Sequence, residues 1–142
     1  MELLQRNARM SYAEIGKSVG LTAPAVAERV RKLEDANIIE GYHAKLNTDA
    51  LGLSIMALVQ IQNPKIHLER VLKLARNAPE VLSCDEVTGQ NNYIMQVVAT
   101  SPDHLRNVLQ RFLEYGMTTS ALVLAQHVGF KAISAETLMN RE

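Results

Sequence analysis

Residues 11–33 read SYAEIGKSVGLTAPAVAERVRKL and contain the start and stop signals of two consecutive helices. Ser11 is a favourable N-cap residue, and Glu14 three positions later completes a capping box. The helix is expected to end near Val19, because Gly20 can adopt the left-handed conformation that terminates a helix. A short helix followed by a sharp turn is therefore predicted.

A second helix is predicted with Thr22 as its N-cap and Pro24 in its first turn, where the helix does not need the missing N–H, and it is expected to end near Ala36. Its expected buried stripe repeats at i, i+4 and i+7 in Val26, Val30 and Leu33. Its outer face carries Ala23, Ala25, Glu28, Arg29 and Lys32. Two short helices joined by a glycine-containing turn are typical of a helix-turn-helix, whose second helix enters the DNA major groove.

The flanking residues complete a small domain. Leu3 and Leu4 are expected at the end of a helix that stops near Ala8, and Gly16 lies where the two later helices must approach closely. The core is expected to consist of Ile15, Val19, Leu21, Val26 and Val30, with Tyr12 as a further inward candidate.

A short hairpin or wing is predicted over residues 38–47, with its turn at Gly41. The predicted domain boundaries follow from this wing. Residues 1–47 form a winged helix-turn-helix domain, residues 48–52 a connector, and residues 53–142 a second domain.

The apolar period changes to two after the connector, interrupted by two helical stretches. The predicted elements are a strand at 53–62, a helix at 67–77, a strand at 81–88, a turn at 89–92, a strand at 93–99, a helix capped by Ser101 that runs to about Tyr115, and a long strand at 119–130. This β-α-β-β-α-β order predicts an α+β fold of the ferredoxin-like type, with a four-stranded antiparallel sheet and both helices on one face. The other face needs a partner in so small a chain, so dimerisation is expected.

The composition limits the classes of function that fit. The chain has 142 residues with 15 basic and 15 acidic side chains, so attraction to nucleic acid must come from a local patch. Cys84 is the only cysteine, which excludes an intrachain disulfide or a cysteine-built zinc site and fits a reducing cytoplasm. The longest apolar-leaning run, residues 51–61, is well short of the roughly 20 residues that a membrane span needs. A cytoplasmic protein without membrane contact, metal or cofactor is expected.

Three positive charges, Arg29, Arg31 and Lys32, fall within four positions of the second predicted helix. Such residues neutralise phosphates and give salt-dependent affinity for DNA. Small residues at the helix start allow close approach but offer few hydrogen bonds to bases, so modest sequence specificity is expected, with DNA shape contributing. The pattern leaves a second interpretation open, a three-helix packing module whose charges form a solvated face paired with Glu28, Glu34 and Asp35.

The sequence resembles the Lrp/AsnC family, the feast/famine regulators of bacteria and archaea. The similarity lies in AEIGKSVGLT at 13–22, ERVRKLE at 28–34 and IIEGY at 38–42, and it continues through 51–53, 79–81, 87–89 and Tyr93. It implies a transcriptional regulator with an N-terminal winged helix-turn-helix and a C-terminal ligand-sensing domain. It further implies homodimers formed by sheet-to-sheet packing, often assembled into octamers or larger rings, and a small effector, usually an amino acid, bound between dimers.

The resemblance also implies where the sites lie. Residues 22–32 would be the DNA-reading helix, and double-stranded DNA is expected to contact Ser11, Tyr12, Thr22, Ala23, Pro24, Ala25, Glu28, Arg29, Arg31, Lys32, His43 and Lys45. The effector would be lined by Thr88, Gly89, Gln90, Asn91, Asn92, Tyr93, Ser120, Ala121, Leu122 and Val123. The chain departs from the family pattern at Asn92, where many relatives carry an acidic residue able to pair with an effector's ammonium group. Family members usually begin earlier, so a clipped first helix is expected.

The sequence gives little support to an enzymatic function and leaves two other non-enzymatic functions open. An enzyme is poorly supported, because the four histidines fall in separate elements and no HExxH, GxSxG or phosphate-cradling glycine motif occurs. Asp85 and Glu86 are adjacent on a strand and point to opposite faces, which is wrong for a carboxylate pair. Two alternatives stay open: an architectural protein that wraps DNA without an effector, and a metabolite-binding regulatory module that acts on an enzyme partner.

Overall fold

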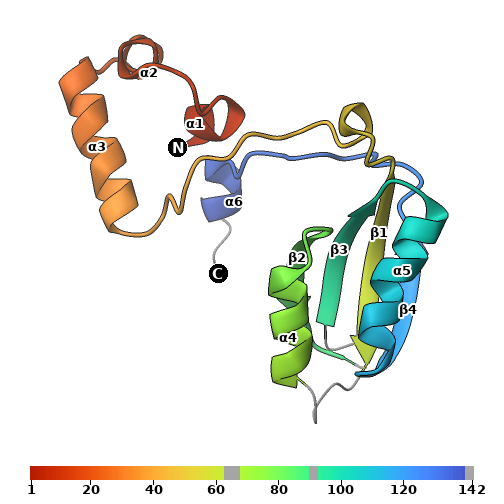
Figure 1. Ribbon diagram of the computed structural model, residues 1–142. Coiled ribbons are helices and arrows are strands. Elements are labelled where there is room, and N and C mark those ends of the chain that lie inside the picture. The colour runs from red at the N-terminus through yellow and green to blue at the C-terminus, as the bar shows by residue number, and fades with distance from the viewer. Residues whose placement is uncertain (63–67, 90–92, 140–142) are drawn as a thin grey trace. The chain divides into compact units, whose positions relative to one another are not determined.

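The computed structural model describes residues 1–62, 68–89 and 93–139, which form two compact units (Figure 1). The helical unit combines residues 1–45 with the chain from Val128 onward, and the sheet unit comprises residues 46–127. The sequence prediction assigned the whole of 53–142 to the second domain. The difference arises because the C-terminal segment makes its contacts with the first 45 residues, through hydrogen bonds that periodicity cannot reveal.

The helical unit is built from short helices, which are α1 (Glu2–Arg6), α2 (Tyr12–Val19), α3 (Ala23–Asp35) and α6 (Ala135–Met139). The predicted capping box is formed, since the Ser11 backbone N–H donates to the Glu14 carboxylate at 2.8 Å and the Glu14 N–H donates to the Ser11 hydroxyl at 3.2 Å. Gly20 ends α2 with a φ of +69°, and the Thr22 hydroxyl accepts from the Ala25 N–H at 3.4 Å. The predicted start and stop signals of both helices are therefore confirmed.

The core of the helical unit is small. Ile15, Val26 and Val30 are 7%, 3% and 4% exposed, and they are surrounded by the partly buried Leu3, Leu4, Met10, Leu21 and Ile39. The expectation that Val19 faces inward is wrong, because this side chain is 51% exposed and borders a hollow. Tyr12, the first residue of α2, is also exposed. Of the predicted stripe of α3, Val26 and Val30 are buried and Leu33 is half-buried.

The segment after α3 differs from the predicted hairpin, since residues 38–47 contain no strand. Asn37 adopts a positive φ of 53°, and the N–H groups of Ile38 and Ile39 both donate to the Leu33 carbonyl, at 2.8 and 3.1 Å. These residues finish α3 instead of starting a strand. The remaining residues as far as Asn47 run without regular structure.

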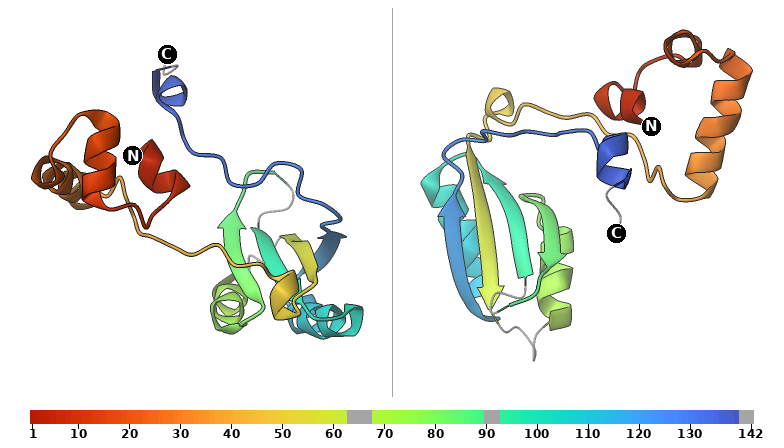
Figure 2. Two further views of the ribbon diagram at one scale, coloured as in Figure 1. Left: turned by 90° about the horizontal axis from the view of Figure 1, so that it is seen from above. Right: turned by 180° about the vertical axis from the view of Figure 1, so that it is seen from behind.

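The sheet unit has the predicted βαββαβ order. It contains β1 (Ile55–Gln62), α4 (Leu68–Asn77), β2 (Val81–Glu86), β3 (Tyr93–Ala99), α5 (Pro102–Leu113) and β4 (Met117–Leu122), preceded by a 3-10 turn at Asp49–Leu51. The strand order is β2-β3-β1-β4 and all pairs are antiparallel. Both helices cover one face of the sheet, as Figure 1 and both views of Figure 2 show.

The core of the sheet unit follows the strand period. Ala57, Val59 and Ile61 of β1 have no exposed surface and alternate with residues of the opposite face, where Leu58 is 39% exposed. The helices contribute Val71, Ala75, Leu105, Val108 and Phe112 to this core. None of the described residues of this unit forms a helix over the opposite face.

The last strand is shorter than predicted. A strand was expected over 119–130, but β4 ends at Leu122, which pairs with Ala57, and the Val123 N–H donates to the Met56 carbonyl at 2.8 Å. In this register Ile55, the first residue of β1, stands opposite position 124, so the chain beyond Leu124 has no neighbouring strand to continue the ladder. Among the described residues, no helix is long and apolar enough to cross a membrane.

A methyl group at Gly16 should destabilise the helical unit. A Cβ built there lies 2.4 Å from the Leu21 carbonyl oxygen, which is backbone and cannot move aside without opening the turn. We expect Gly16→Ala to cost about 1–3 kcal/mol, as overpacking does, despite the better helix propensity of alanine. Thermal melting followed by circular dichroism measures this, with the exposed Lys17→Ala in the same helix as the control. A Gly16→Ala variant as stable as the parent would contradict the close approach.

Candidate nucleic-acid and effector sites

One face of α3 is free of packing contacts. Successive residues of a helix are about 100° apart, so Glu28, Arg31 and Lys32 project from the side opposite the buried Val26 and Val30. The three cations of α3 that are predicted to bind DNA, Arg29, Arg31 and Lys32, are exposed. The structure therefore presents a cationic helix face whose other side is anchored in the core.

The positive charges on this face of α3 form only one ion pair with residues that the structure describes, and it is exposed to solvent. The Lys32 ammonium lies 2.8 Å from the Glu28 carboxylate, and both side chains are more than half exposed. The hydrogen bond and the charge of Lys32 hold the pKa of Glu28 below its usual value. Water and salt screen such a pair, so a phosphate can replace the carboxylate. Arg29 and Arg31 form no ion pair with any residue that the structure describes.

The predicted contacts at the helix starts have local roles. The hydroxyls of Ser11 and Thr22 cap α2 and α3, so they orient the helix ends. Pro24 is exposed, whereas Ala23 and Ala25 are half-buried. Pro24 has no N–H, and the N–H groups of Ala25 and Val26 donate to Thr22, so it is the helix dipole that favours a phosphate at the start of α3.

Tyr42 fixes the segment that follows α3, a role that no sequence pattern signalled. Its hydroxyl donates to the Glu34 carboxylate at 2.9 Å. Burial, this hydrogen bond, and the charge of Glu34 raise the pKa of Tyr42 to about 12, so the phenol stays protonated at neutral pH. The predicted contacts His43 and Lys45 follow directly and are exposed.

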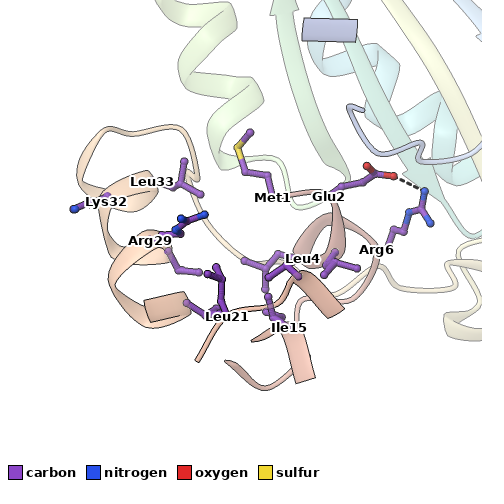
Figure 3. A pocket seen from close by; sticks show the side chains of 13 residues that line it. Met1, Glu2, Leu4, Arg6, Ile15, Leu21, Arg29, Lys32 and Leu33 are labelled. Carbon is purple, nitrogen blue, oxygen red and sulfur yellow. Dashed lines mark hydrogen bonds and ion pairs between the residues drawn. The ribbon is translucent and has the colours of Figure 1, made fainter. Parts of the chain in front are cut away.

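A hollow of about 640 Å³ lies between α1 and α3 of the helical unit (Figure 3). Leu4, Ile15 and Leu21 line it, and the charged groups at its rim are partly engaged, since Arg6 pairs with Glu2 of the same helix. A ligand site normally combines an apolar wall with a few convergent polar groups. The charged residues that line this hollow are Glu2, Arg6, Arg29 and Lys32, of which the last two are predicted DNA contacts, and the hollow indicates that α1 packs loosely on α3.

The first part of the predicted effector site is the end of the β2–β3 pair. Tyr93 is 6% exposed, and Thr88 and Gly89 are exposed, with a φ of +106° at Gly89. Gln90, Asn91 and Asn92 lie outside the described residues. Glu86 stands directly opposite Tyr93 in the ladder. Burial, the charge of Glu86 and a hydrogen bond between the two side chains raise the pKa of Tyr93.

The second part of the predicted effector site lies on another strand. Ser120, Ala121 and Leu122 of β4 are exposed and Val123 is half-buried. Strand β1 separates β4 from β3, so the two parts are two strand spacings, about 10 Å, apart across the sheet. They are also displaced along the strands, because Tyr93 is level with Thr118 and not with Ser120. The structure does not bring them together within one chain.

The sheet unit contains one cluster of charged groups near its helices. Glu80 pairs with His104 at 3.3 Å and with Arg111 at 2.9 Å. Burial raises the pKa of Glu80, but hydrogen bonds from its own backbone N–H, Arg111 and His104 outweigh that effect and lower it. The cluster ties α5 to the residue before β2. No group of three or more potential metal ligands occurs among the described residues.

Known proteins match the chain along most of its length. The profile of the AsnC-type helix-turn-helix domain matches residues 1–34, and that of the Lrp/AsnC ligand binding domain matches residues 55–133. The HTH-type transcriptional regulator YezC of Bacillus subtilis (strain 168) is 35% identical over 122 residues, which are 86% of each chain.

Solved structures agree with both units. Transcriptional regulator NMB0573 from Neisseria meningitidis, in complex with L-Met, has a TM-score of 0.88 at 27% identity and covers 96% of this chain and 93% of that chain. The feast or famine regulatory protein Rv3291c from M. tuberculosis, complexed with L-methionine, has a TM-score of 0.76 at 28% identity and covers 89% of this chain and 88% of that chain.

Proposed function

Since the chain belongs to the Lrp/AsnC family of transcriptional regulators, we propose that it acts on promoters by seating α3 in the major groove of double-stranded DNA. The single observation that carries this proposal is the exposed cationic face of α3 opposite its buried stripe. Arg29, Arg31 and Lys32 neutralise phosphates beside the groove. His43 and Lys45 reach further phosphates from the segment after the helix.

The open face of the sheet supports assembly into homodimers. Leu58 is partly exposed at its centre, and a one-sided antiparallel sheet in a small unit gains stability when a second copy covers it. We propose that two copies pack sheet to sheet and that dimers assemble further, to octamers or similar rings. Several reading helices on one body raise the effective affinity for DNA with repeated half-sites.

We further propose that a small amino acid modulates the regulator. The two relatives with bound L-methionine, NMB0573 and Rv3291c, support this class of effector. The two predicted parts of the site are too far apart within one chain for a small molecule to bridge, so the pocket is completed between chains. Glu86, opposite Tyr93, provides a carboxylate for the effector's ammonium group at the end of the sheet where Asn92 offers none.

Removing two cations from α3 should weaken DNA binding. We expect Arg29→Ala combined with Lys32→Ala to lower affinity for duplex DNA by about 10- to 100-fold at moderate salt and to reduce the salt slope by about 2. Fluorescence anisotropy over a salt series measures both quantities. The control removes two cations of the same spacing from α4, Arg70→Ala with Lys73→Ala. Unchanged affinity and slope in the α3 variant would exclude this helix as the reading element.

An amino-acid effector should stabilise the sheet unit through Glu86. We expect L-methionine in excess to raise the melting temperature of the parent, because a ligand that binds only the folded state stabilises it. Glu86→Gln should remove this shift. Glu114→Gln makes the same change at an exposed residue directly after α5, and should keep it. A shift that survives Glu86→Gln, or no shift with any of the twenty amino acids in the parent, would refute this effector site.

A further inference from the structure

The C-terminal segment is attached to the first helix by a two-sided clamp. The Gln5 side-chain amide donates to the Ile133 carbonyl at 3.1 Å, and the Ile133 N–H donates to the Gln5 amide oxygen at 2.9 Å. Only an Asn or Gln side chain offers a donor and an acceptor side by side, as a backbone peptide does. The contact joins residues that are 128 positions apart in the sequence.

The burial pattern around Ile133 supports docking of the segment along one side. Ala132 and Ser134 are half-buried, whereas Lys131, Ile133 and Ala135 are exposed. An extended chain that lies against a surface shows this alternation, because successive side chains point to opposite sides. The segment therefore meets the helical unit over several residues and not at Ile133 alone.

Helix α1 needs such an attachment. It has five residues and none is buried, and the 640 Å³ hollow separates it from α3 (Figure 3). Leu3 and Leu4 are only partly buried against the core. Since α1 gains little from packing, hydrogen bonds from outside the three-helix group decide how firmly it is held.

The path of the chain connects this attachment to the sheet unit. The chain leaves the helical unit after Lys45 and returns to it at Val128. Two stretches of chain therefore connect the helical unit to the sheet unit, one that leads into β1 and one that leaves β4. Two connections restrict the motion of the helical unit, which we call the DNA-reading head, more than a single linker does. This holds only if the second connection is fixed to the helical unit at its C-terminal end.

We propose that residues 128–139 form a strap that docks on α1 through the Gln5–Ile133 clamp and holds the DNA-reading head in its binding conformation. Exposed hydrogen bonds contribute little to stability, so the equilibrium between docked and undocked strap favours the docked state only slightly. The strap can therefore be released. Release loosens α1, and with it the support of α2 and α3, without changing any residue that touches DNA. The effect of the strap on DNA affinity rests on the proposed function, whereas its docking does not.

The test replaces Gln5 with methionine, which keeps the length and the helix propensity of the side chain but removes both hydrogen bonds. The matched control is Gln110→Met on the exposed side of α5. Hydrogen exchange of the Ile133 amide reports docking, and fluorescence anisotropy with duplex DNA reports the reading head. We expect Gln5→Met to accelerate exchange at Ile133 and to weaken DNA binding about three- to tenfold, and Gln110→Met to change neither.

A second substitution tests the clamp from its other end. Ile133→Pro removes the donating N–H, so it should weaken DNA binding by the same factor as Gln5→Met, and the double variant should bind no more weakly than either single one. The proposal fails if the Ile133 amide of the parent exchanges as in an unstructured peptide, or if Gln5→Met leaves DNA affinity at the parent value. The Arg29→Ala, Lys32→Ala protein separates the two claims, because it should lose DNA binding and keep Ile133 protected.

Discussion

The close approach of Gly16 to the Leu21 carbonyl is the constraint on which the helical unit depends. It brings α2 against α3 across a three-residue turn, so that Ile15, Val26 and Val30 form the buried core of the unit. Once that stripe of α3 is buried, helical geometry leaves the side with Arg31 and Lys32 in solvent. The exposure of the cationic face is thus a consequence of packing on the opposite face.

The sheet unit faces a related constraint, because its two helices cover only one side of four strands. The alternation in β1 places Val59 in the core and Leu58 on the uncovered side. A second chain over that side would remove apolar surface from water, and the proposed effector pocket between chains would need such an assembly. Assembly and effector binding are therefore expected to depend on each other.

Local rules predicted most of the elements, because each was set by residues close in sequence. The caps at Ser11 and Thr22, the turn at Gly20 and the stripe of α3 were all confirmed. The errors occurred where partners far along the chain decide the outcome. No period or turn residue could show that β4 stops opposite Ala57, near the start of β1, or that Ile38 and Ile39 close α3.

Fewer features of the candidate sites than of the fold could be predicted from the sequence. The cations of α3 could be identified from their spacing, and the structure leaves them exposed. Two contacts beside the predicted sites, Tyr42 with Glu34 and Glu86 with Tyr93, could not be predicted, since only folding brings those side chains together. The clamp on Ile133 was invisible for the same reason.

The most direct measurement of the central claim is an NMR titration of the ¹⁵N-labelled chain with duplex DNA carrying its operator. If α3 is the reading element, the largest changes in amide chemical shift will fall between Thr22 and Lys32, with smaller changes from His43 to Lys45. Changes confined to residues 46–127, with the amides of α3 unmoved at saturation, would contradict it.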